Sequence, residues 1–154
     1  MKKILFVCLG NICRSPTADG IMRKLVSDAG MEQKILVDSA GTGDWHIGRA
    51  PDARTIKAAA KRGYDLSVLR ARLVHANDFD EFDYILAMDK SNLENLQKMK
   101  PDHFIGHLGL LMDFASETGL KEVPDPYHGD ADDFEHVLNL VEQATQNLMK
   151  KVMG

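Results

Sequence analysis

The chain has 154 residues, of which 44% are hydrophobic and 27% charged, and its formal net charge is −4. This composition is ordinary for one globular domain, residues 1–154, that buries its own core. The acidic balance argues against nucleic acid or an anionic membrane as a partner, and no apolar run approaches the ~20 residues of a membrane span.

Two cysteines are too few for a secreted disulfide framework. The first residues run directly into an apolar segment without the cleavage site of a signal peptide. The sequence therefore predicts a cytoplasmic protein.

The first elements are a strand, a tight loop and a helix. A short buried strand is predicted over residues 4–7, and apolar residues at helical spacing predict a helix that ends at Gly30. We expect Ser15 to cap this helix and Pro16 to occupy its first position. The loop between the two elements opens with Cys8 and closes with Arg14.

This loop has the residue types of an oxyanion site. A loop that enters a helix can turn its N–H groups inward as a nest for an anion, reinforced by the positive end of the helix. Gly10 and Asn11 tolerate the positive φ that a nest requires. Arg14 can hold two oxygens of a tetrahedral anion, and this surrounding favours the thiolate form of Cys8. The loop therefore predicts a nucleophile in a phosphate-sized cradle, and the alternative is a small buried cysteine near a surface arginine.

The segment Val7–Pro16, VCLGNICRSP, resembles the phosphate-binding loop of the low-molecular-weight protein tyrosine phosphatases. It matches the pattern V-C-x-G-N-x-C-R-S-P at every specified position, and the resemblance continues through residues 38–42, 82–86 and 125–127. It implies a single-domain, three-layer α/β fold, in which a four-stranded parallel sheet of order 2-1-3-4 carries helices on both faces. The phosphate-binding loop would comprise Leu9, Gly10, Asn11, Ile12, Cys13 and Ser15 between the catalytic residues Cys8 and Arg14.

A second strand is predicted over residues 34–38, followed by a loop that begins at Ser39. The resemblance implies that Ser39 supports the phosphate loop by pairing with Asn11, whereas the residues alone leave open a serine that solvates a turn. The only tryptophan, Trp45, lies among glycines and polar residues, and by resemblance it forms a wall of the substrate cleft. A helix is predicted over residues 52–62.

The sequence departs from the family at Leu69, where many relatives carry a histidine that supports the phosphate loop. Residues 82–88 predict a third strand, and the helix after it has capping-box spacing from Ser91 to Glu94. Residues 103–108 predict a fourth strand. His103 and His107 lie in this strand, but no cysteine or carboxylate cluster completes a metal site, so no metal or other cofactor is expected.

Residues 110–123 are irregular and lead to Pro124-Asp125-Pro126-Tyr127. Two prolines fix the backbone around Asp125, which suits a carboxyl group held over a cleft, although an aspartate in a polar turn is common. By resemblance Asp125 is the general acid and Tyr127 a second cleft wall. From residue 130 onward the apolar periodicity predicts a long amphipathic helix.

The resemblance thus implies a protein-tyrosine-phosphatase that hydrolyses phosphotyrosine monoesters in protein substrates through a phosphocysteine intermediate, without a metal. It also implies that Cys13 forms a reversible disulfide with the nucleophile, the alternative being a merely buried thiol. Protein-arginine phosphatases share the fold but carry a threonine where this chain has Ile12, so phosphotyrosine is preferred. Arsenate reductases need further cysteines that this chain lacks, and a non-catalytic phosphate-binding module would not need both Cys8 and Asp125.

Overall fold

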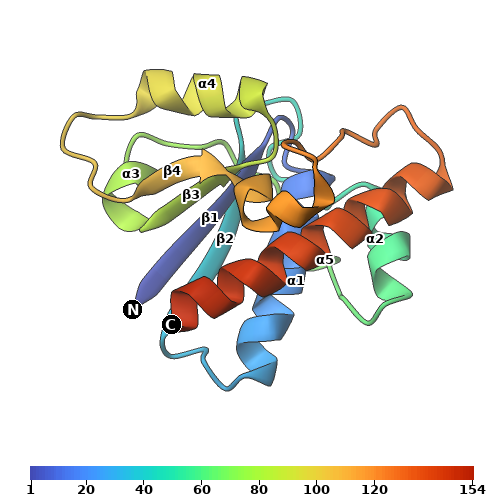
Figure 1. Ribbon diagram of the computed structural model, residues 1–154. Helices are drawn as coiled ribbons and strands as arrows, with labels where there is room; N and C mark the ends of the chain where they lie inside the picture. The colour runs from blue at the N-terminus through green and yellow to red at the C-terminus, as the bar shows by residue number, and fades with distance from the viewer.

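The computed structural model describes residues 1–154, which form three layers with a parallel sheet in the middle (Figure 1). The strand order β2-β1-β3-β4 confirms the predicted order 2-1-3-4, and every neighbouring pair is parallel. The strands are β1 (Lys2–Cys8), β2 (Ile35–Gly41), β3 (Tyr84–Ala87) and β4 (His107–Leu110). The helices are α1 (Arg14–Asp28), α2 (Ala53–Ala60), α3 (Asp78–Glu81), α4 (Lys90–Met99), the 3-10 helix η1 (Leu111–Thr118) and α5 (Ala131–Met153).

Strand β1 lies in the centre of the sheet and is buried on both faces. Successive side chains of a strand point to opposite faces. Ile4 and Phe6 pack in the larger core cluster with α1 and α5, whereas Leu5 and Val7 pack in a second cluster with residues of α3 and α4. The continuous apolar run that predicted this strand therefore follows from the helices that cover both faces (Figure 1).

Local capping signals account for several helix ends. Gly30 follows α1 with a φ of 66°, the left-handed conformation that glycine adopts without strain. Asp130 caps α5 in a capping box with Asp133. The predicted capping box of α4 is wrong, because α4 begins earlier and Asp89 accepts the hydrogen bond from the Asn92 amide.

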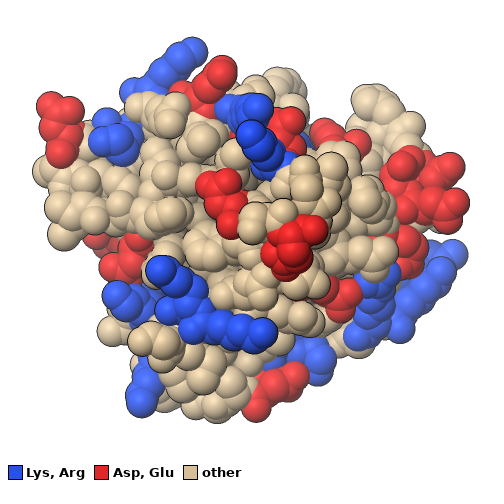
Figure 2. Space-filling view, in the orientation of Figure 1, with Lys and Arg blue, Asp and Glu red and all other residues tan.

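Other boundaries differ from the sequence expectation. The fourth strand covers His107–Leu110 rather than residues 103–108, because the turn after Pro101 extends the chain out of the sheet before pairing with β3 begins. Half of the segment predicted as irregular forms η1, and the short helix α3 was not predicted. No helix is long and apolar enough to cross a membrane. Figure 2 shows acidic and basic side chains interspersed over one face of the molecule.

The carboxyl ends of the strands gather the segments of interest at one edge of the sheet. Cys8 ends β1 opposite Gly41, which ends β2, and Asp89 follows β3 directly after Met88. Ligands of open parallel sheets bind beyond this edge. The candidate site is therefore expected there.

Candidate active site

The loop between β1 and α1 curls around the sulfur of Cys8. The backbone N–H of Asn11 donates to Sγ over 3.3 Å, and Ser15 Oγ lies 3.0 Å from Sγ in hydrogen-bonding geometry. Both contacts are buried and favour a negatively charged sulfur. One backbone N–H and one hydroxyl of the loop therefore contact the sulfur directly.

Asn11 is the only residue other than glycine with a positive φ, 56°, which confirms the expectation for this position. The expectation for Gly10 is wrong, since its φ is not positive. A Cβ at Gly10 would lie 3.0 Å from His46 Cδ2, a tight contact that a small shift of the His46 side chain would relieve. Gly41 meets the loop from β2, and a Cβ at this position would lie 2.8 Å from the Leu9 carbonyl oxygen.

Ser15 is not the helix cap. Helix α1 begins one residue earlier, at Arg14, and the capping position falls on Cys13 without a side-chain hydrogen bond. The Ser15 hydroxyl turns towards the sulfur and accepts a 2.8 Å hydrogen bond from Asn11 Nδ2. Pro16 is thus the third helical residue, where its missing N–H leaves no hydrogen bond unmade.

Arg14 is buried behind the loop, with its guanidinium directed to the cleft. Its Nη1 donates to Asp89 Oδ2 over 2.7 Å and to the Val123 carbonyl oxygen over 3.0 Å. Burial alone would lower the pKa of Arg14, but Cys8, Asp89 and Asp125 outweigh burial and raise it, so the guanidinium stays charged. Asp89 was not predicted as a site residue, although an aspartate directly after a buried parallel strand marks the ligand-binding edge.

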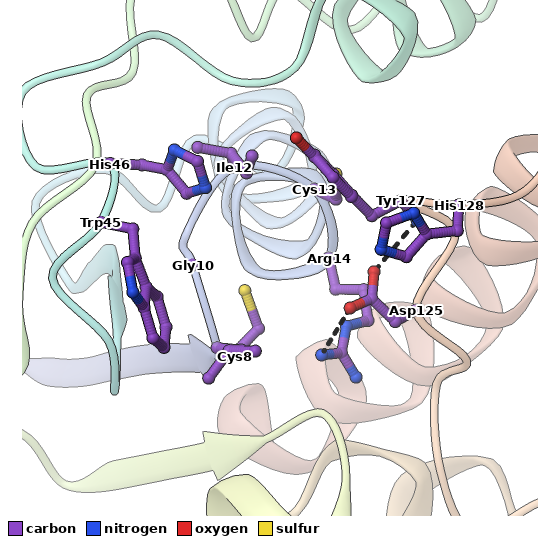
Figure 3. Close-up of a pocket in the computed structure, with 11 residues that line it drawn as sticks. Cys8, Gly10, Ile12, Cys13, Arg14, Trp45, His46, Asp125, Tyr127 and His128 are labelled. Carbon is purple, nitrogen blue, oxygen red and sulfur yellow. Dashed lines mark hydrogen bonds and ion pairs between the residues drawn. The ribbon is translucent and has the colours of Figure 1, made fainter.

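Asp125 lies beside Arg14 on the side of the cleft opposite Trp45, with 3.7 Å between its Oδ2 and Arg14 Nη2 (Figure 3). Its side chain is half exposed, and its Oδ1 accepts a hydrogen bond from the Tyr127 amide. Arg54 fixes the far side of this segment, because it donates to the Tyr127 carbonyl oxygen over 2.9 Å while pairing with Asp52. The near side is fixed by a hydrogen bond from the Val123 amide to the carbonyl oxygen of Met88, the residue directly after β3.

A cleft of about 290 Å³ opens over the sulfur. Trp45 stands on one side and Tyr127 on the other, and both were predicted as walls (Figure 3). The Trp45 side chain is 66% exposed, but its ring packs over Gly43, where an added Cβ would overlap it. The other lining residues are Leu9, Gly10, Ile12, Cys13, Arg14, Asp125, His46 and His128, of which the two histidines were not predicted.

Cys13 is a free, buried thiol at the inner end of the cleft. Burial raises its pKa to about 12, although the nearby Thr55 side chain acts to lower it. Cys13 is therefore a neutral thiol at physiological pH. Cys8 is also free and buried.

Ser39 does not pair with Asn11, which corrects the sequence expectation. Ser39 lies opposite Phe6, two residues before the end of β2, and its side chain opposes the rise that burial causes in the pKa of Asp19 on α1. The side chain of a residue so far from the strand end meets the helix rather than the loop. The Oδ1 atom of Asn11 accepts instead from the backbone N–H of Arg72 over 3.0 Å.

The cleft thus combines a sulfur nucleophile, inward amides, a charged guanidinium and a carboxyl group on the opposite side. A tetrahedral oxyanion over the sulfur would have three oxygens near the loop amides and Arg14. Its fourth oxygen would point out towards Asp125 between the aromatic walls. This geometry suits transfer of a phosphoryl group from an aromatic leaving group to sulfur.

Comparisons with known proteins agree with this geometry. The family model "Low molecular weight phosphotyrosine protein phosphatase" matches residues 3–153. The chain is 41% identical to the low molecular weight protein-tyrosine-phosphatase YfkJ of Bacillus subtilis over 99% of this chain and 96% of that protein. Among solved structures, a protein tyrosine phosphatase from Entamoeba histolytica aligns with a TM-score of 0.95 and 39% identity, covering 99% of this chain and 97% of the other. A Drosophila arginine phosphatase aligns with a TM-score of 0.92 and 30% identity, covering 100% and 99%.

Proposed function

The chain belongs to the low molecular weight phosphotyrosine protein phosphatase family, and we propose that Cys8, Arg14 and Asp125 perform its reaction. The enzyme hydrolyses phosphotyrosine monoesters through a phosphocysteine intermediate. The observation that carries the residue assignment is the position of the Cys8 sulfur. It receives the Asn11 amide and the Ser15 hydroxyl at the base of a cleft that Arg14 and Asp125 enter from the other side.

In the first step the Cys8 thiolate attacks phosphorus in line with the leaving oxygen. The sulfur–phosphorus bond forms while the phosphorus–oxygen bond breaks. The loop amides and Arg14 stabilise the charge that spreads over the three equatorial oxygens. Asp125, protonated at this moment, donates its proton to the departing phenolate.

In the second step Asp125 acts as the base, because it has given up its proton. It takes a proton from a water molecule that attacks phosphorus, and the phosphorus–sulfur bond breaks. The Ser15 hydroxyl, 3.0 Å from the sulfur, stabilises the leaving thiolate. No step draws on a metal ion.

The substrate class follows from the walls of the cleft. Trp45 and Tyr127 present aromatic faces on either side, and Ile12 adds an apolar surface between them, so a phenyl ring would be held by stacking and apolar contact. We infer that phosphotyrosine-containing proteins are the physiological substrates. Arginine phosphatases of this fold carry threonine at the position of Ile12, and an apolar side chain offers the guanidinium of phosphoarginine no hydrogen bond.

The test is phosphate release from matched phosphotyrosine, phosphoserine and phosphoarginine peptides, with EDTA present. We expect fast release from phosphotyrosine by the wild type and none by Cys8→Ser. Preference for phosphoarginine would refute the inference that Ile12 selects phosphotyrosine, but it would leave Cys8 as the nucleophile. Normal turnover by Cys8→Ser would refute the mechanism, and no release from any peptide would favour a phosphate-binding module.

We infer that Cys13 protects the nucleophile from irreversible oxidation. Peroxide converts the Cys8 thiolate to a sulfenic acid, which condenses with the Cys13 thiol to a disulfide and releases water. The two residues line the same cleft. The Cys13 thiol gives up its proton as its sulfur attacks the sulfenic sulfur, and this proton leaves with the displaced hydroxyl group as water. A thiol reagent should restore activity after peroxide in the wild type but not in Cys13→Ser; equal recovery in both would refute the role.

The chain as a whole fits one cytoplasmic enzyme domain, residues 1–154. Both cysteines are free, which is usual in a reducing compartment. The family match spans residues 3–153, and the larger core cluster draws on both the first strand and the last helix. The net charge of −4 supports a protein substrate rather than nucleic acid or a membrane surface.

A further inference from the structure

The conformation of Asn11 is held entirely by its side chain. Its left-handed backbone, φ 56°, aims the N–H at the Cys8 sulfur, and an L-residue adopts this conformation at a cost. Asn11 Nδ2 donates to Ser15 Oγ, which itself contacts the sulfur, and Asn11 Oδ1 accepts from the Arg72 amide. Both donors to the sulfur therefore depend on the orientation of one carboxamide.

The Arg72 amide is the only donor to Asn11 Oδ1. Leu69, three residues earlier, packs against the core and has no polar atom in its side chain. The oxygen end of the carboxamide is thus held by a single backbone N–H, while its nitrogen end is held by Ser15. A small displacement of Arg72 would free one end of Asn11.

Residue 72 lies in a segment with little regular structure. Between α2 and α3 the backbone forms only an isolated bridge, in which Leu73 pairs with Gly41 at the end of β2. The Gly41 amide donates to the Arg72 carbonyl oxygen over 2.8 Å, and the Val74 amide donates back to Gly41. Ala71 makes two further backbone hydrogen bonds, one with Gly48 and one with Arg49. These four hydrogen bonds join the segment to a strand end and to a loop.

The side chain of Arg72 makes the further contacts that hold this segment in place. Its guanidinium makes a bidentate contact with Asp78, with both N–O distances 3.1 Å, and a third hydrogen bond of 3.1 Å with Asp38. Asp78 is buried, and it also accepts the His75 amide over 2.8 Å. Asp38 belongs to β2 and Asp78 to α3, so Arg72 joins its own segment to two regular elements. Bidentate pairs of this kind fix geometry as well as charge.

We propose that Arg72 is a positioning residue for the phosphate-binding loop, because its ion pairs with Asp38 and Asp78 hold its backbone N–H on Asn11. Through Asn11 the ion pairs set the amide and the hydroxyl that contact the Cys8 sulfur. Arg72 touches neither substrate nor sulfur, so it acts through another residue. The inference rests on the proposed role of Cys8 as the nucleophile.

The test measures the pH midpoint of alkylation of Cys8 by iodoacetamide, with the modified cysteine identified by mass spectrometry. The variants are Asp78→Asn, which keeps the shape of the side chain, and Arg72→Lys, which keeps the charge but loses the bidentate contact. Arg62→Lys is the matched control. Arg62 also bridges two carboxylates, Glu135 and Glu142, with similar exposure but no connection to the loop.

We expect both Asp78→Asn and Arg72→Lys to raise the midpoint by roughly half to one pH unit, since donors to the thiolate are displaced. The kcat/KM for a phosphotyrosine peptide below the midpoint should fall about three- to tenfold, in proportion to the thiolate fraction. Arg62→Lys should change neither. Asp78→Asn is decisive because two explanations predict opposite shifts. If the charge of Asp78 acted directly on Cys8, its loss would lower the midpoint. If Asp78 acts by positioning the donors to the sulfur, its loss raises the midpoint.

A lowered midpoint in Asp78→Asn, or an unchanged midpoint in Arg72→Lys, would overturn the proposal, whatever the change in stability. If either variant does not fold, Asp38→Asn takes its place, because this partner is more exposed, and the same rise is expected. Alkylation does not require turnover. A wild type without phosphatase activity would therefore refute the proposed function, while the midpoints still test the role of Arg72.

Discussion

Replacing Asp125 by asparagine tests the proposed acid without moving the loop that carries it. Asparagine keeps an oxygen that can accept the Tyr127 amide, and Arg54 still holds the far side of the segment. The variant lacks only a transferable proton and a negative charge. The rate of the first step should fall in this variant, whereas its affinity for oxyanions should rise.

The rate of the first step should fall. General acid catalysis contributes about 10²–10⁴-fold, so kcat/KM for a phosphotyrosine peptide should fall by that factor in Asp125→Asn. Oxyanion binding should improve, because Asp125 Oδ2 lies 3.7 Å from Arg14 Nη2 and competes for it. Unit charges at this distance attract by about 1 kcal/mol in water and about 4 kcal/mol at a protein surface.

The lower value for the attraction between Asp125 and Arg14 applies here, since the Asp125 side chain is half exposed and exposed ion pairs contribute about 0–1 kcal/mol. A gain of about 1 kcal/mol corresponds to roughly fivefold tighter binding. The assay compares inhibition by inorganic phosphate at neutral pH with kcat/KM for two substrates. One is a phosphotyrosine peptide, and the other is p-nitrophenyl phosphate, whose leaving group departs without a proton.

The loss in Asp125→Asn should be much smaller for p-nitrophenyl phosphate than for the peptide. Asp89→Asn is the control, because Asp89 also contacts Arg14, through Nη1 rather than Nη2, but does not line the cleft. Asparagine can still cap α4 at this position. The control should slow both substrates equally. An equal loss for both substrates in Asp125→Asn would refute the assignment of the acid.

Three further predictions concern the surroundings of the loop. Gly41→Ala should cost about 1–3 kcal/mol of stability and most of the activity, because its Cβ would lie 2.8 Å from the Leu9 carbonyl oxygen. Urea denaturation measures the loss of stability, and kcat/KM measures the loss of activity. Burial raises the pKa of Cys13 from 9.0 to about 12, so the folded state holds this proton more tightly than the unfolded chain. Stability should be fully present below about pH 9 and decline towards pH 12, and urea denaturation should show a smaller decline in Cys13→Ala. Arg54→Met should free the Tyr127 carbonyl and lower kcat/KM roughly tenfold, with inhibition by inorganic phosphate unchanged.

Each of these has a matched control. Gly63→Ala places a side chain at a positive φ with no atom within 4 Å, so it should cost stability without loss of activity. Arg70→Met removes an arginine that bonds only to nearby carbonyl oxygens and should leave kcat/KM unchanged. Full activity in Gly41→Ala, an unchanged decline in Cys13→Ala, or equal effects of Arg54→Met and Arg70→Met would contradict the respective prediction.

The sequence by itself determined the central elements, because their signals are local. The apolar run of β1 predicts burial on both faces, and Gly30 and Asp130 mark helix ends through their own backbone and side-chain chemistry. The ten residues of VCLGNICRSP carry the nucleophile, the nest and the arginine in one stretch. Their function was therefore predictable before any contact was known.

Only the tertiary structure decided which distant groups complete the site. Asp89 contacts Arg14 from 75 residues away, and the Arg72 amide reaches Asn11 across 61 residues. Ser15 was misassigned as a cap because α1 begins one residue earlier than its sequence signal, at Arg14. Hydrophobic periodicity and turn preferences describe neighbours along the chain, whereas ion pairs and hydrogen bonds between separate elements depend on how the sheet and its helices pack.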